Sequence, residues 1–133
     1  AAAALRSIDH GEIGRRGEAL CAQLLEAEGF RVLAQRLRTP HGEVDLVARR
    51  GARLWCVEVK STRASPGGRD GGFDPGTRLG QRQRARLARA ADDCARALGD
   101  RASPGLALVE IWVDGRGRAA DWRLTELRAP AGD

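Results

Sequence analysis

The sequence predicts one α/β domain, a central mixed β-sheet flanked by helices in the order α-β-β-β-α-β-β. Two segments carry apolar residues at helical spacing, and five shorter apolar runs are bounded by turn residues. The first three runs follow one another closely, as in an antiparallel meander, and the second helical segment separates them from the last two. A chain of 133 residues is long enough for one domain and short for two.

The first four elements follow directly from this pattern. A helix is expected over residues 11–28, where apolar residues form one stripe, and a short β-rich strand over residues 30–35. The runs at residues 43–48 and 54–60 read as an antiparallel hairpin. Between them, residues 49–52 supply polar side chains and a glycine for a tight turn.

The remaining elements follow a segment that cannot hold regular structure. Residues 64–77 are rich in glycine and proline and are expected to form a mobile surface loop. A second helix is expected over residues 79–98, because apolar residues there recur at helical spacing up to a glycine stop. A buried strand at residues 106–113 and a weaker one at 120–127 complete the sheet.

We expect residues 11–127 to form the domain, between a flexible N-terminus at residues 1–10 and a frayed tail at 128–133. No apolar run approaches the roughly 20 residues of a membrane span, and no charged-then-apolar leader is present, so the expected location is the cytoplasm. The cysteines are odd in number and lack zinc-ligand spacing, which favours small buried hydrophobes in a reducing compartment. They are Cys21, Cys56 and Cys94.

The basic residues carry two signals of different strength. A net charge of +5 with a pI near 10.3 is compatible with a polyanionic partner, but moderately basic domains often have none. Lys60 is more informative, because it is the only lysine among 23 basic residues. Lysine offers a compact charge with a tunable pKa, whereas arginine is a permanently charged planar fork. A specific role for Lys60 is therefore one interpretation, and chance is the other.

Two acids interrupt the apolar strands of the predicted hairpin. Residues two apart in a strand share a face, so Glu58 and Lys60 point the same way. Asp45 lies in the preceding strand, and twelve residues separate it from Glu58, so the hairpin brings the two carboxylates near each other. Carboxylates that converge repel, and a divalent cation resolves the repulsion.

An Asp, a spacer and then Glu-x-Lys is the arrangement of phosphodiesterases with a PD-(D/E)xK core. Asp45, Glu58 and the main-chain carbonyl of Val59 would hold Mg²⁺ or Mn²⁺, which activates water and polarises the phosphoryl oxygen. Lys60 would hold the attacking water or offset the charge that develops on the phosphate. The alternative is an ordinary surface hairpin with a Glu–Lys ion pair.

Four blocks of sequence resemble the YraN family of small bacterial proteins. They are Gly14-Arg15-Arg16-Gly17-Glu18-Ala19-Leu20, Gly29-Phe30-Arg31-Val32-Leu33, Gly42-Glu43-Val44-Asp45-Leu46-Val47-Ala48 and Val57-Glu58-Val59-Lys60, with Arg63 close behind. The resemblance implies a restriction-endonuclease-like fold, related to that of archaeal-type Holliday junction resolvases. It implies a catalytic site made of Glu18, Asp45, Glu58 and Lys60, in which Glu18 orients a water or supports a second cation.

The chain departs from the family pattern at two positions. Arg36 stands where members usually carry an asparagine, and no lysine occurs near Gln83, where relatives usually begin the second helix with one. The helix is instead rich in arginine, and its N-terminus adds a partial positive charge, so it can follow a phosphate backbone. The predicted nucleic-acid contacts are Arg38, Arg63, Arg78, Arg82, Arg86 and Arg89. The alternative for the helix is a solvated arginine face.

These observations favour a metal-dependent DNA endonuclease that recognises the shape of its substrate, including branched DNA. Symmetric cutting of two strands would call for a homodimer. The second hypothesis is a non-catalytic module that keeps the fold and binds nucleic acid or a protein, because a motif acts only in the right geometry. The third is a structural protein with a buried Glu–Lys pair and no nucleic acid.

Overall fold

The computed structural model describes residues 10–65, 79–100 and 102–129 of the chain. Within them, the element order α-β-β-β-α-β-β is confirmed. The elements are α1 (His10–Ala27), β1 (Arg31–Thr39), β2 (Gly42–Arg50), β3 (Arg53–Arg63), α2 (Gln81–Ala97), β4 (Gly105–Val113) and β5 (Ala119–Leu127). Neither described helix combines the length and the apolar character needed to cross a membrane.

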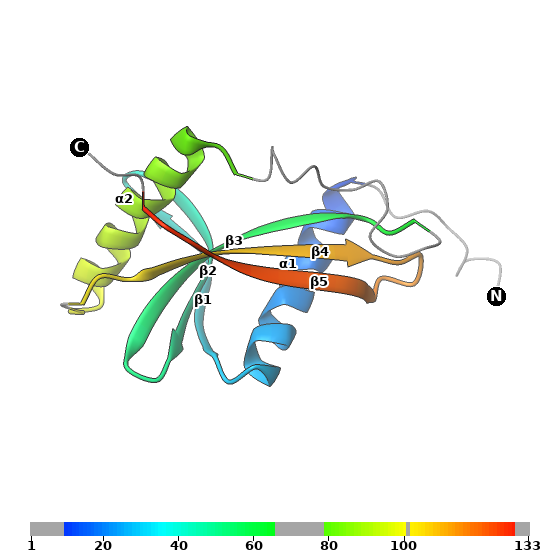
Figure 1. Ribbon diagram of the computed structural model, residues 1–133, viewed down its shortest axis with the longest axis horizontal. Helices are drawn as coiled ribbons and strands as arrows, with labels where there is room; N and C mark the ends of the chain where they lie inside the picture. Colours follow the sequence, from blue (N-terminus) through cyan, green and yellow to red (C-terminus); the bar gives the residue numbers. More distant parts are fainter. Residues whose placement is uncertain (1–9, 66–78, 101, 130–133) are drawn as a thin grey trace.

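The strands form one mixed sheet in the order β1-β2-β3-β4-β5. The pairs β1–β2, β2–β3 and β4–β5 are antiparallel, whereas β3 and β4 run parallel. A parallel pair needs a crossover connection, and α2 lies in the segment between β3 and β4. The predicted meander and the mixed character of the sheet are both confirmed. Figure 1 shows the strongly twisted sheet with α1 and α2 lying apart from each other.

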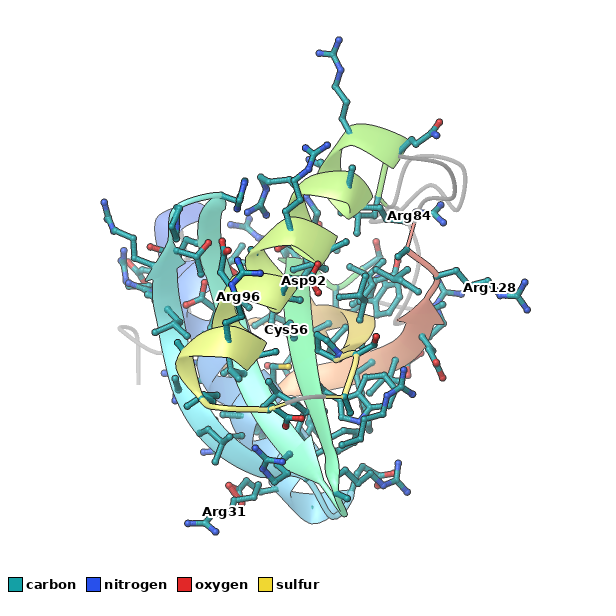
Figure 2. The ribbon with its side chains drawn as sticks, turned by 90° about the vertical axis from the view of Figure 1, so that its left-hand side faces the viewer. Arg31, Cys56, Arg84, Asp92, Arg96 and Arg128 are labelled. Carbon is teal, nitrogen blue, oxygen red and sulfur yellow. The ribbon has the colours of Figure 1, made fainter. Side chains whose placement is uncertain are left out.

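Each helix covers its own core on one face of the sheet. Leu25 of α1 is fully buried in a cluster with Val57 and Val109. Leu87 of α2 is fully buried in a second cluster with Cys56. Because side chains alternate along a strand, neighbouring residues of β3 contribute to the two clusters. Figure 2 looks onto α2, with Cys56 beneath the helix. All three cysteines are free and buried, as predicted.

Element bounds differ from the prediction mainly at β1 and at the first hairpin. The strand predicted at residues 30–35 extends to Thr39. The added residues are largely polar and exposed, so they lack the apolar pattern of a strand, but an edge strand needs little burial. The turn between β2 and β3 is shorter than the predicted 49–52, since β2 continues to Arg50 and β3 begins at Arg53, which leaves Gly51 and Ala52 as the turn. Gly51 has φ +59, a left-handed conformation that a tight hairpin turn requires.

Some predictions concern residues outside the described part of the chain. These are most of the flexible N-terminus (residues 1–9), most of the loop (66–77), Arg78 and the end of the tail (130–133). They remain predictions, as does the domain limit at residues 11–127. At the edges of these segments, His10 begins α1, and Ala64 donates its backbone N–H to the carbonyl of Val113 at 2.7 Å.

Candidate functional site

The candidate site lies where β2 and β3 stop pairing. Their ladder runs from the turn pair Arg50 and Arg53 to the pair Leu46 and Val57. Beyond it, Asp45 Oδ2 accepts the backbone N–H of Val59 at 2.8 Å. Beyond the ladder, a side-chain hydrogen bond thus replaces the main-chain hydrogen bonds, and the Asp45 carboxylate is held close to β3.

The carboxylates of Asp45 and Glu58 converge, as predicted from the hairpin. Burial, and after it the nearby Asp45 carboxylate, raise the pKa of Glu58 to about 7, although Lys60 and Arg86 oppose the rise. The pKa of Asp45 is also raised, chiefly by burial, and the Val59 N–H opposes this shift. Burial thus makes the charged forms of both acids costly, and a bound cation would stabilise those charged forms.

The chemistry of these side chains tests whether the implied cation fits the site. Asp45 and Glu58 provide two hard oxygen ligands next to Val59, whose carbonyl is the third predicted ligand, and Mg²⁺ binds by few carboxylates while keeping several waters. Within the described residues, no three His, Cys, Asp or Glu side chains gather at metal-ligand spacing. The donor set therefore fits one cation held by two carboxylates and does not fit an all-protein cage.

Arg86 of α2 lies over the two acids rather than projecting from the helix as a free phosphate contact. Its Nη2 is 3.6 Å from Glu58 Oε1, and its Nη1 donates to the carbonyl of Glu43 at 3.2 Å. The guanidinium lies so close to Gly42 that a Cβ there would be 2.5 Å from Nη1. Gly42, with φ +121, thus makes room for the arginine, which connects α2 to the hairpin.

Glu18 reaches the site from α1 because that helix approaches β3 very closely. A Cβ on Gly17 would be 1.9 Å from the hydroxyl oxygen of Ser61, the residue after Lys60. Glu18 raises the pKa of Asp45, as expected for a nearby acid. Its carboxylate is not free, because Arg36 Nε donates to Glu18 Oε1 at 2.7 Å.

Arg36 makes this contact from a backbone conformation that is unusual for its residue type. Its φ of +52 is the only positive value among the described non-glycine residues. Asparagine enters this left-handed region more readily than arginine does. An asparagine at position 36, as in the family pattern that the sequence resembles, would therefore fit this backbone better. Arginine instead adds the contact with Glu18.

The other predicted arginines lie around the site and not in it. Arg38, in β1, and Arg63, at the end of β3, are exposed, as are Arg82 and Arg89 on α2. Arg38 pairs across the β1–β2 ladder with Glu43. Their role as phosphate contacts remains a prediction.

Two acids near the site were absent from the sequence prediction. Glu43 raises the pKa of Asp45 and provides the carbonyl that Arg86 contacts. Glu110 is fully buried in β4 and is the partner of Lys60 in the β3–β4 register. Glu110 interrupts an apolar strand just as Asp45 does, so the same argument could have identified it.

Comparison with known sequences matches this part of the chain to one family. The profile described as "Uncharacterised protein family UPF0102" covers residues 17–103, which include the four predicted site residues Glu18, Asp45, Glu58 and Lys60. A UPF0102 protein of Parvibaculum lavamentivorans is 47% identical over 79 residues, covering 59% of this chain and 54% of the relative.

Two further relatives match shorter segments. UPF0102 proteins of Bradyrhizobium sp. (strain ORS 278) and Caulobacter vibrioides are 56% and 53% identical over 52 and 49 residues. These segments cover 39% and 37% of this chain, and 36% and 39% of the relatives. The chain thus spans about half the length, or less, of the curated relatives it matches.

Proposed function

The chain belongs to the UPF0102 family, the YraN family, and from its site we propose that it is a metal-dependent endonuclease that hydrolyses phosphodiester bonds in DNA. The supporting observation is that Asp45 and Glu58 converge beside the chain's single lysine, where burial and the Asp45 charge raise the pKa of Glu58 to about 7. A restriction-endonuclease-like fold and a cytoplasmic location are part of the same proposal.

The residues take separate parts in this reaction. Asp45, Glu58 and the Val59 carbonyl hold Mg²⁺ or Mn²⁺, which when bound supplies Lewis-acid activation of water and phosphate. Lys60 donates hydrogen bonds to the attacking water or to the phosphate oxygen on which charge develops. Glu18, released from Arg36, orients a water molecule by accepting a hydrogen bond from it.

The arginines provide contacts with the DNA backbone. Arg86 exchanges its contact with Glu58 for the scissile phosphate, because a guanidinium binds phosphate as well as carboxylate in a bidentate manner. Five further arginines position the duplex or branch without reading its sequence. They are Arg38, Arg63, Arg78, Arg82 and Arg89. Recognition by shape favours branched substrates, and a homodimer would present two sites to two strands.

The direct experiment is cleavage of end-labelled four-way junction, nicked duplex and single-stranded DNA with Mg²⁺ or Mn²⁺. We expect cleavage of a branched or nicked substrate that is abolished in Asp45→Asn and Lys60→Met. Glu126→Gln is the matched control, because Glu126 is an exposed acid of β5 that pairs with Arg53 away from the site. Absence of cleavage on every substrate, with all variants folded, would contradict the proposal.

One observation favours a non-catalytic DNA-binding module instead. Glu58 and Glu18 each contact an arginine, Arg86 and Arg36, so the site contains ion pairs that could serve structure alone. That function predicts salt-sensitive DNA binding that survives Asp45→Asn, with no hydrolysis by the wild-type protein.

A further inference from the structure

Glu110 is the only polar or charged residue with a fully buried side chain in the described part of the molecule. It lies in the middle of β4, where every residue from Gly105 to Val113 is buried. Glutamate is almost never fully buried unless it is paired, because removing its charge from water is costly. Its neighbours in the sheet therefore decide what this carboxylate does.

Those neighbours are two cations, one on each adjacent strand. The β3–β4 register pairs Glu110 with Lys60, and the β4–β5 register pairs it with Arg123. Paired residues on neighbouring strands project from the same face of a sheet, so the three side chains form one row. Arg123 holds one end of the row, since its Nε and Nη2 both lie 2.9 Å from Glu110 Oε1.

Lys60 consequently lies between two carboxylates with different surroundings. Glu58 is two residues earlier on the same face of β3, and Lys60 acts on its charge. Glu110 is one strand away, fixed by Arg123 and fully buried. An ammonium that pairs with Glu58 competes with a cation for that carboxylate, whereas an ammonium that pairs with Glu110 does not.

We propose that Glu110 is a positioning residue, which draws the ammonium of Lys60 toward β4 and so leaves Glu58 available to a divalent cation. Arg123 fixes the Glu110 carboxylate, and Glu110 in turn fixes the lysine. The effect on the cation rests on the proposed function, but the attraction between Glu110 and Lys60, which we infer from their register, does not. The two claims can therefore fail separately.

The contact is tested on the metal-free protein, because Lys60 is the only lysine and gives a single signal after ¹³C,¹⁵N-lysine labelling. We expect Glu110→Gln, which keeps the side-chain volume, to shift the side-chain signal of Lys60 and to increase its mobility in NMR relaxation. Glu126→Gln, the control in β5, leaves the signal unchanged. Identical lysine signals in Glu110→Gln and Glu126→Gln would overturn the proposal.

A second variant covers the case in which Glu110→Gln does not fold. Arg123→Gln removes the other cation of the row, so Glu110 then binds Lys60 alone, and we expect the mobility of Lys60 to fall. An unchanged Lys60 signal in folded Arg123→Gln would overturn the proposal as well. If Glu110 served only to neutralise Arg123, the Lys60 signal would not change in Arg123→Gln.

The consequence for the cation is measured by Mn²⁺ titration in a double-mutant cycle. Glu110→Gln is expected to weaken Mn²⁺ binding by at least about fivefold when Lys60 is present. In the Lys60→Met background the same substitution changes the affinity by no more than about twofold. Equal weakening in both backgrounds overturns the proposal. Absence of Mn²⁺ binding by the wild type contradicts the proposed function instead, and the lysine signal still decides the contact.

Discussion

The Asp45 carboxylate accepts the backbone N–H of Val59 at 2.8 Å, across the point where the β2–β3 ladder ends. This bond fixes the carboxylate through a main-chain N–H of β3 and not through a cationic side chain. It also holds the acid against Glu58, the residue before Val59. The arrangement favours a cation binding site at the cost of repulsion when no cation is present.

The burial of Glu58, together with that repulsion, predicts an unusual pH dependence in the metal-free protein. The pKa of Glu58 is about 7 in the folded state and 4.5 in its ordinary environment, so the folded state binds more protons between these values. The free energy of unfolding should therefore fall as pH rises from about 4.5 to about 7. Urea unfolding in EDTA across this range measures it.

Glu58→Gln is expected to reduce this fall, because glutamine does not titrate. Glu126→Gln serves as the control, since Glu126 is exposed, and should retain the wild-type slope. A wild-type stability that is flat or rises between these pH values would contradict the raised pKa of Glu58, and with it the burial of this acid beside Asp45.

The close approach of α1 to β3 predicts a strong difference between two glycines of the same helix. Gly17→Ala introduces a Cβ that would lie 2.6 Å from Ser61 Cβ, so it should lower the free energy of unfolding by about 1–3 kcal/mol. Gly14→Ala meets no atom within 4 Å and should raise it by up to about 1 kcal/mol. Thermal and urea unfolding of both variants compare the two sites.

A compensating substitution checks the cause. Ser61→Gly removes the atoms that the new methyl group meets, so it should cost less stability in the Gly17→Ala background than in the wild type. Additive effects of Gly17→Ala and Ser61→Gly would mean that this contact does not limit the packing of α1.

Arg86 should affect cation and DNA binding in opposite directions. Arg86→Gln removes a positive charge 3.6 Å from Glu58 Oε1, so Mn²⁺ binding without DNA should become several-fold tighter, by about 1 kcal/mol. DNA binding should weaken, with a smaller dependence on salt. Arg82→Gln is the control, because Arg82 is exposed on the same helix and should change only DNA binding. Weaker Mn²⁺ binding in Arg86→Gln would contradict this role.

The left-handed conformation of Arg36 predicts an unusual tolerance to glycine. Arg36→Gly loses the contact with Glu18 but relieves the backbone, so stability should stay within about 0.5 kcal/mol of the wild type. Arg38→Gly, in the same strand without positive φ, should cost about 1 kcal/mol. Equal losses in both variants, measured by urea unfolding, would show that Arg36 is not strained.

The sequence was sufficient to predict the order of elements and the convergence of Asp45 and Glu58, because both depend on local periodicity and on the length of one hairpin. It was not sufficient for Arg36 or Arg86. Their contacts depend on a positive φ in an edge strand and on where α2 crosses the sheet, and neither leaves a local pattern. Glu110 lies between these cases, since its apolar surroundings were visible but its partner Lys60 appears only with the β3–β4 register.

The most direct test of the account is a calorimetric titration of Mn²⁺ into the wild type, Asp45→Asn and Glu58→Gln at neutral pH. We predict one binding site in the wild type, loss of measurable binding in both variants, and retained binding in Glu126→Gln. Binding that is absent from the wild type, or unchanged when Asp45 is replaced, would contradict a cation site between β2 and β3.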